Sequence, residues 1–314
     1  MSLDLRDRVV YTEAATGAYA VTAAVAALAG ASSVIAVAGQ SRHGTVADAT
    51  TQTEQLAAIL GVRDRINVTA RRDASDVATA DVVTNSGHVR PIDGSFVRWM
   101  KPTAVVPLMF EAWEIEVGRF DVDLPALRER GIAFAGTSER HPTVGVFEHL
   151  GSMAVAELIA CGVAPRGARV LVVCDNPFAA YLEDGLARAG VHVTLTASVQ
   201  ETIAARVQDV IMIAARPAGR PIIDPAAAAA VRQNWPGAIV VQFWGDIDRT
   251  ALAAAGVGYW PAASPAAGHM GVLPSAIGPE PVVQLQTGGL KVAEVLLKSP
   301  DERSQTDLEY IDEL

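Results

Sequence analysis

The chain contains few of the residues that mark several common protein classes. Only two cysteines, Cys161 and Cys174, occur among 314 residues, which excludes a disulfide framework. Both lie among apolar residues, so we expect two buried free thiols in a reducing cytoplasm. The six histidines are scattered and show no His-x-x-x-His spacing, and no Cys-x-x-Cys occurs. No metal site is therefore indicated.

Positive charge and long apolar runs are also scarce. The 25 Lys and Arg against 35 Asp and Glu give a formal net charge of -10, which argues against nucleic acid or an anionic membrane as partner. The apolar run 14–29 lacks the basic start of a signal peptide, and no run has the length and hydrophobicity of a membrane span. We expect a cytoplasmic protein whose partner is a small molecule; a homodimer stays open.

What the sequence does contain is an alternation of short Val- and Ile-rich segments with helical patterns of ten or more residues. Parallel sheets covered by helices require this alternation. A chain of 314 residues is long for one core and suits two domains. We expect an α/β fold of two Rossmann-like domains, each a doubly wound parallel sheet, with a cleft between them. The expected domains are 1–141 plus 282–314, and 142–281.

The stretch from Asp121 to Asn176 joins the two expected domains. A helix ends at Gly131 and feeds a short apolar strand, 132–135. A long helix follows, with apolar residues near helical spacing, and ends at Gly162, a C-cap glycine. The strand 169–174 then begins the second α/β unit.

The order of elements in this stretch carries a resemblance. An acidic residue and the letters DL precede ALRERGI, which leads into a strand that ends in a threonine. After a loop, the letters EH open an apolar helix, and RGARV then begins the next strand. This order resembles the D-2-hydroxyacid dehydrogenases, over about residues 80–297, with this chain as a diverged member. The resemblance implies an NAD(P)-dependent oxidoreductase acting on a small polar metabolite, of the 2-hydroxy or 2-keto acid type, in the interdomain cleft. The alternative is a non-redox protein on the same fold that binds a small ligand or nucleotide and is regulatory or catalytically lapsed.

The glycines with which such folds approach a pyrophosphate are absent. After the first expected strand, 8–11, only Gly17 is present, and a plain strand-to-helix turn is favoured over a phosphate site. After the strand 169–174 the turn reads Asp175, Asn176, Pro177 and Phe178, where proline lacks a donor and phenylalanine blocks close approach. Asp175 and Asn176 are the candidate contacts for NAD or NADP, and we expect no pyrophosphate against this turn.

Small polar residues after the strands give the candidate site, because open α/β sheets place ligands at the carboxyl ends of their strands. By resemblance, the loop after the strand 81–84 faces the substrate. His269 lies near the family's catalytic histidine and would act as general acid and base; a structural hydrogen-bonding role is the alternative. Trp244 or Gly245 stands where the family has a substrate-binding arginine, with Arg249 nearby. The expected ligand contacts are Asn85, Ser86, Gly87, His88, Asn176, Trp244 and Asp246.

The end of the chain divides into a helix and a tail. The helix 282–298 matches the family's C-terminal helix that packs back on the first domain. The tail, 299–314, is acidic and polar, which predicts a loosely docked or disordered end.

Overall fold

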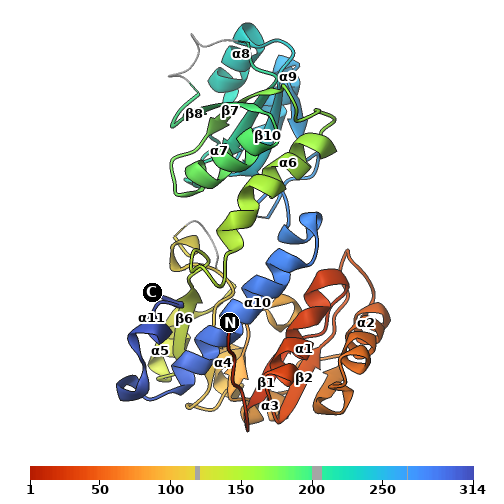
Figure 1. The fold of residues 1–314 in the computed structure, drawn as a ribbon, viewed down its shortest axis with the longest axis vertical. Coiled ribbons are helices and arrows are strands. Elements are labelled where there is room, and N and C mark those ends of the chain that lie inside the picture. The colour runs from red at the N-terminus through yellow and green to blue at the C-terminus, as the bar shows by residue number, and fades with distance from the viewer. Residues whose placement is uncertain (117–120, 200–206, 267) are drawn as a thin grey trace. The chain divides into compact units, whose positions relative to one another are not determined.

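The computed structural model of the chain describes residues 1–116, 121–199, 207–266 and 268–314. These residues form two compact units: unit 1 is Met1–Val146 with Gly278–Leu314, and unit 2 is Phe147–Ile277. Each unit is built on a largely parallel sheet covered by helices (Figure 1), which confirms the predicted fold class. Within the described ranges, no helix is long and apolar enough to cross a membrane.

The sheet of unit 1 has seven strands in the order β12-β6-β5-β4-β1-β2-β3. All neighbours pair in parallel except β12, which is antiparallel to β6. The chain therefore runs outward from β1 in both directions, with β1 beside β4 in the middle of the sheet. The strands are β1 (Val9–Glu13), β2 (Ser33–Val37), β3 (Ile66–Thr69), β4 (Val82–Val83), β5 (Val105–Pro107), β6 (Ala133–Thr137) and β12 (Ile311–Asp312).

Both faces of this sheet are buried under helices. Successive side chains of a strand point to opposite faces, so Val10 belongs to one apolar core and Tyr11 to the other. One core includes side chains of α1 (Val21–Leu28), α2 (Val46–Ile59) and α10 (Glu280–Leu297). The other includes side chains of α3 (Ala74–Thr79), α4 (Gly94–Trp99) and α5 (Leu124–Glu129). Burial on both faces explains why these strands read as nearly continuous apolar runs.

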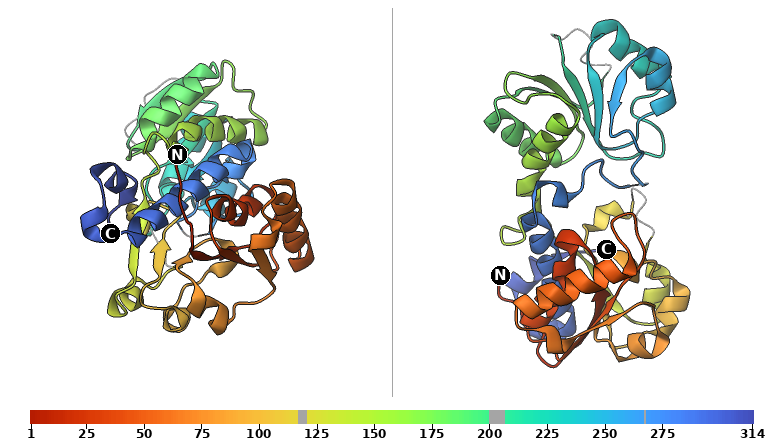
Figure 2. Two further views of the ribbon diagram at one scale, coloured as in Figure 1. Left: turned by 60° about the horizontal axis from the view of Figure 1, so that its bottom comes forward. Right: turned by 90° about the vertical axis from the view of Figure 1, so that its right-hand side faces the viewer.

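The long helix α10 packs on unit 1, as expected from the sequence. It contacts β5, β6 and α1, and Figure 2 shows it beside α1 in both views. Gly288 and Gly289 allow this close approach, because a Cβ at Gly289 would overlap the side chain of Met109 and one at Gly288 would lie 2.9 Å from Val144. Two glycines in mid-helix thus have a packing reason.

Unit 2 has five parallel strands in the order β11-β10-β9-β7-β8. Helices α8 and α9 cover one face through a core that includes Leu171, Ile211 and Val240. The two other helices, α6 and α7, cross at Gly151 and Gly185. A Cβ on either glycine would overlap the backbone of the other glycine. The elements are α6 (Leu150–Ala160), β7 (Arg169–Val173), α7 (Phe178–Arg188), β8 (His192–Thr196), β9 (Val210–Ala214), α8 (Pro225–Asn234), β10 (Ile239–Trp244), α9 (Arg249–Ala255) and β11 (Gly258–Trp260).

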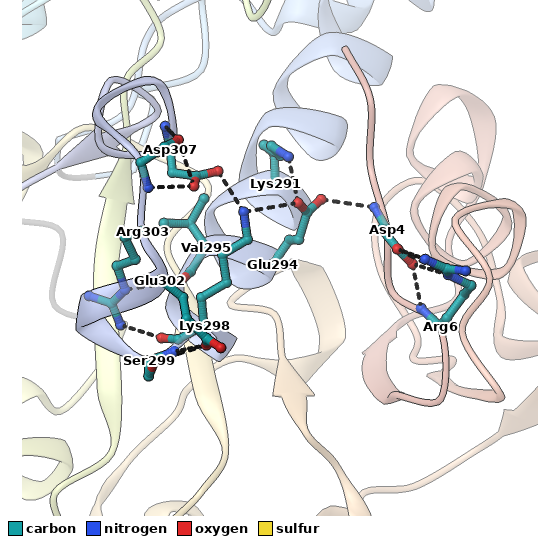
Figure 3. Close-up of polar contacts among 11 residues, drawn as sticks. Asp4, Arg6, Lys291, Glu294, Val295, Lys298, Ser299, Glu302, Arg303 and Asp307 are labelled. Atoms are coloured by element: carbon teal, nitrogen blue, oxygen red, sulfur yellow. Dashed lines mark hydrogen bonds and ion pairs between the residues drawn. The ribbon is translucent and has the colours of Figure 1, made fainter.

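The C-terminal tail is ordered, so the prediction of a loosely docked or disordered end is wrong. It forms α11 (Gln305–Leu308) and then β12, which pairs with β6. Lys298 donates to Asp307 at 2.8 Å, and Arg303 donates to backbone oxygens of α10 (Figure 3). Most of the tail is exposed, but Asp307 and Tyr310 are buried and hold it to the rest of unit 1.

We expect the Lys298–Asp307 pair to stabilise the tail in a pH-dependent way. Burial raises the pKa of Asp307, but hydrogen bonds from Lys298 and Ser304 outweigh it and lower the pKa from 3.8 to about 2. The contribution of Asp307 is therefore present above its unfolded pKa and is lost as the pH falls through about 2. Asp307→Asn should lower the free energy of unfolding by about 1–2 kcal/mol at pH 7. In urea titrations from pH 7 to 2.5, the gap to the wild type should shrink toward the lowest pH.

The exposed Asp301 on the same tail provides the matched control. Asp301→Asn should leave the stability within about 0.5 kcal/mol of the wild type at every pH. An Asp307→Asn effect as small as this one would contradict the role given to the pair.

Candidate functional site in unit 1

The direction of the chain changes between β1 and β4, so their carboxyl ends form the topological switch point of unit 1. At such a point the two following loops leave toward opposite faces of the sheet, and ligands bind there in open α/β folds. Glu13 ends β1, and the loop of Asn85, Ser86, Gly87 and His88 follows β4. The structure thus brings the first group of predicted site residues together with Glu13, which the sequence interpretation missed.

Glu13 is a buried acid, with 5% of its surface exposed. Its carboxyl group lies against the backbone of Gly87, where an added Cβ would overlap it, and Gly87 has φ +35. Burial raises the pKa of Glu13 to about 7, against the opposing effects of the Arg90 charge and the backbone N–H of His88. The carboxyl is therefore roughly half protonated at neutral pH and can both give and take a proton.

Three buried hydroxyl groups lie at the same two strand ends. Thr12 and Thr84 are 2.8 Å apart at their Oγ1 atoms, and Thr84 and Ser86 are 2.7 Å apart. Thr12 and Ser86 close the triangle at 3.2 Å. Each hydroxyl can donate or accept, so the cluster can adapt to either protonation state of a neighbouring group.

The loop after β4 also carries unpaired hydrogen-bond donors. Asn85 accepts from the backbone N–H of Met109 at 2.8 Å through Oδ1, and its buried Nδ2 has no partner among the described residues. Within those residues, the backbone N–H groups of Asn85, Ser86 and Gly87 also make no hydrogen bond. Asn85 and Ser86 are buried and Gly87 is half-buried. Because buried donors are nearly always paired in native proteins, the donors of Asn85 and Ser86 indicate a place for an acceptor from outside the chain.

His88 completes the loop. Its imidazole lies directly on Gly39, at the end of β2, where a Cβ would come 2.5 Å from Nδ1. Burial, followed by the nearby Arg90 charge, lowers the pKa of His88, so the ring is neutral at pH 7. Arg90 itself is paired with Asp121 at 2.8 Å. The loop therefore presents neutral donors and a neutral imidazole.

The turn after β1 is not a phosphate site. The backbone N–H of Gly17 donates to Gln52 at 2.7 Å, and that of Ala15 donates to Thr53 at 3.2 Å. These amides, which would approach a phosphate, are already used. The preference for a plain turn around Gly17 agrees with this geometry.

The corresponding switch point of unit 2, between β7 and β9, is closed by side chains of its own chain. Asn176 donates through Nδ2 to the backbone oxygen of Ala214 at 2.7 Å. Asp175 accepts from the backbone N–H of Arg216 at 2.9 Å. Both side chains, predicted to contact a cofactor or ligand, therefore join the ends of two strands.

A nicotinamide dinucleotide does not fit this turn in the pose that glycine-rich folds use. The backbone N–H of Phe178, at the start of α7, donates to Oδ1 of Asn176 at 3.0 Å. The ring of Phe178 is buried and lies 5.3 Å from that of Trp244, filling the space that a glycine leaves free. At the end of β8, Thr196 donates to the backbone of Ser198, and the described residues that follow, 197–199, include no acid that could bind a ribose. The described residues of this turn therefore do not offer a pyrophosphate the close approach that glycine-rich folds provide.

Trp244 belongs to the core of unit 2, and its predicted contact with a ligand stays a prediction. Only 1% of its surface is exposed, and its Nε1 donates to the backbone oxygen of Gly268 at 3.2 Å. The bulky side chain ends a fully buried strand, and this explains why it packs inward. Asp246, two residues later, is half-buried.

Arg249 is not available as a displaced substrate-binding arginine. Its Nη2 donates to Gln242 at 2.6 Å and to the backbone oxygen of Pro261 at 3.2 Å. Its guanidinium also lies 5.8 Å from the ring centre of Tyr259. Arg249 thus holds the end of β10 to the segment after β11.

His269 lies half-buried beside this segment, and its backbone N–H donates to Ala266 at 3.0 Å. The catalytic role of His269 stays a prediction. No group of three His, Cys, Asp or Glu in the described parts of the chain is arranged to hold a metal ion.

Comparisons with known proteins identify similar folds but no shared chemistry. Models of known protein families and curated protein sequences give no match. Among solved structures, a dipicolinate synthase subunit from Bacillus halodurans is similar, with a TM-score of 0.58 and 12% identity over 95% of this chain and 100% of that one. The TT0316 protein from Thermus thermophilus has a TM-score of 0.50 and 15% identity over 92% and 96%.

A third similar structure is a D-isomer specific 2-hydroxyacid dehydrogenase from Polaromonas, described as putative, with a TM-score of 0.44 and 18% identity over 68% of this chain and 82% of that one. Identities this low show the fold alone. The chain has a fold built of two Rossmann-like units.

Proposed function

We propose that the chain binds a small polar metabolite carrying a carboxylate, of the 2-hydroxy or 2-keto acid type, at the carboxyl edge of the unit 1 sheet. The observation that carries the proposal is the group of unpaired donors on Asn85, Ser86 and Gly87. A carboxylate is an acceptor-only group of matching size. Its oxygens would satisfy the amide donors that no described residue reaches.

The same geometry favours the non-redox alternative over an NAD(P)-dependent dehydrogenase. Hydride transfer needs the nicotinamide held at a fixed place, and the turn between β7 and α7 is closed by Asn176 and filled by Phe178. Glu13 and His88 supply proton-transfer chemistry without a redox cofactor. We therefore propose a ligand-binding protein or a non-redox enzyme with its site in unit 1.

Isothermal titration calorimetry with pyruvate, NAD and NADP tests this proposal. Pyruvate should bind the wild type, whereas neither dinucleotide should give saturable heat at millimolar concentration. Gly39→Ala should weaken pyruvate binding about tenfold, because the new methyl group displaces the imidazole of His88 and one hydrogen bond is worth roughly that factor.

Gly237→Ala is the matched control, since a Cβ at Gly237 meets open space. It should leave pyruvate affinity unchanged. Saturable NAD binding together with no pyruvate binding would overturn the proposal in favour of a dinucleotide protein.

A further inference from the structure

Glu13 and the unpaired donors of the loop after β4 share one place. The carboxyl of Glu13 contacts the backbone of Gly87 and faces the N–H of His88. The backbone N–H groups of Ser86 and Gly87 directly precede that of His88 in the chain. An anion held by those donors would therefore lie beside the Glu13 carboxyl.

We infer that binding of a carboxylate at this loop is coupled to the uptake of one proton, which Glu13 holds. The inference rests on the proposed function and adds the protonation state in which the site accepts its ligand. Two carboxyl groups sharing one site cannot both ionise without a large cost, so one of them takes a proton from solvent. A protonated Glu13 is also a donor and can bind an oxygen of the ligand.

Among the residues that the structure describes, those that act on Glu13 cannot neutralise a second negative charge. Arg90 is the charged residue that acts on it, and its guanidinium is already paired with Asp121. His88 is kept neutral by burial and by the Arg90 charge. The polar side chains at the ends of β1 and β4, Thr12, Thr84 and Ser86, are hydroxyls. The high pKa of the free Glu13 agrees with this arrangement.

The coupling has a defined pH dependence. The pKa of Glu13 in the free protein is raised to about 7, so below that pH the acid is already protonated and affinity for a carboxylate is constant. Above it, each bound ligand must bring a proton, and the dissociation constant rises about tenfold per pH unit. The ligand class is thus a small carboxylate bound together with one proton.

Calorimetry with pyruvate from pH 6 to pH 9 tests the coupling. The wild-type dissociation constant should be flat near pH 6 and rise roughly tenfold between pH 7.5 and 8.5. Glu13→Gln keeps the size of the side chain and a donor but cannot titrate, so its dissociation constant should stay flat over the whole range. Glu129→Gln, at an exposed acid on α5, should keep the wild-type profile.

A direct proton count does not depend on a variant. Titrations at pH 8.5 in two buffers of different ionisation enthalpy should show uptake of about one proton per pyruvate bound by the wild type. Pyruvate binding with a flat profile and no proton uptake would overturn the coupling and leave the proposed function standing. Absence of pyruvate binding at every pH would overturn both.

Discussion

Gly87→Ala should abolish measurable pyruvate binding and lower the free energy of unfolding of unit 1 by about 2–5 kcal/mol. A left-handed backbone costs an alanine about 1–2 kcal/mol, and Gly87 has φ +35. The new Cβ would also occupy the place of the Glu13 carboxyl. Because Glu13 is buried, its displacement disturbs packing at a further cost of about 1–3 kcal/mol. Urea denaturation and calorimetry with pyruvate measure the two effects.

Gly61→Ala separates the backbone cost from the clash. Gly61 has φ +72, and a Cβ there meets open space, so this variant should lose only about 1–2 kcal/mol and bind pyruvate normally. Equal losses of stability in the two variants, with binding kept in both, would show that Gly87 and Glu13 do not form the site.

Trp244→Ala should destabilise unit 2 by about 3–5 kcal/mol, the usual cost of truncating a large buried aromatic side chain. Its indole is almost fully buried, packs against Phe178 and donates to Gly268. Removal leaves a cavity and an unpaired carbonyl. Thermal unfolding followed by circular dichroism measures the change, and pyruvate affinity at 10 °C, where the fold persists, should be unchanged.

Trp99→Ala is the control of equal size. Trp99 is 37% exposed and packs on Phe96, so its loss should cost about 1 kcal/mol. A Trp244→Ala variant of nearly wild-type stability that no longer binds pyruvate would restore Trp244 to the site and contradict its place in the core.

The fold was predictable because its strands are buried on both faces. The run 169–174 is apolar between turn residues, and the structure has the largely buried strand β7 there, at Arg169–Val173. The order of the strands within each sheet could not be predicted from the periodicity of apolar residues alone. The tail was misjudged because its composition does not reveal that Lys298 reaches Asp307 or that β12 pairs with β6.

The site was predictable only where it is local in sequence. Asn85 to His88 follow one strand directly, so position alone identifies them. Glu13 is a single acid at the end of an apolar run, and its significance depends on β1 lying beside β4, with Val10 opposite Val82. A charged residue that continues an apolar strand is the signal that could have found it.

In unit 2, two residues at the same position after a strand already have partners within the chain. Asp175 and Asn176 also follow a strand, but their side chains hydrogen-bond to Arg216 and Ala214 across the switch point. Sequence shows which residues stand at a sheet edge, and it does not show whether their hydrogen bonds are already used.

The measurement that tests the location of the site most directly is a crystal structure of the wild-type protein soaked with both pyruvate and NAD. We expect the pyruvate carboxylate within hydrogen-bond distance of the backbone N–H groups of Ser86 and Gly87, with Glu13 beside it, and no diphosphate against Phe178. A dinucleotide lying along the turn between β7 and α7, with no pyruvate at the loop after β4, would contradict the account.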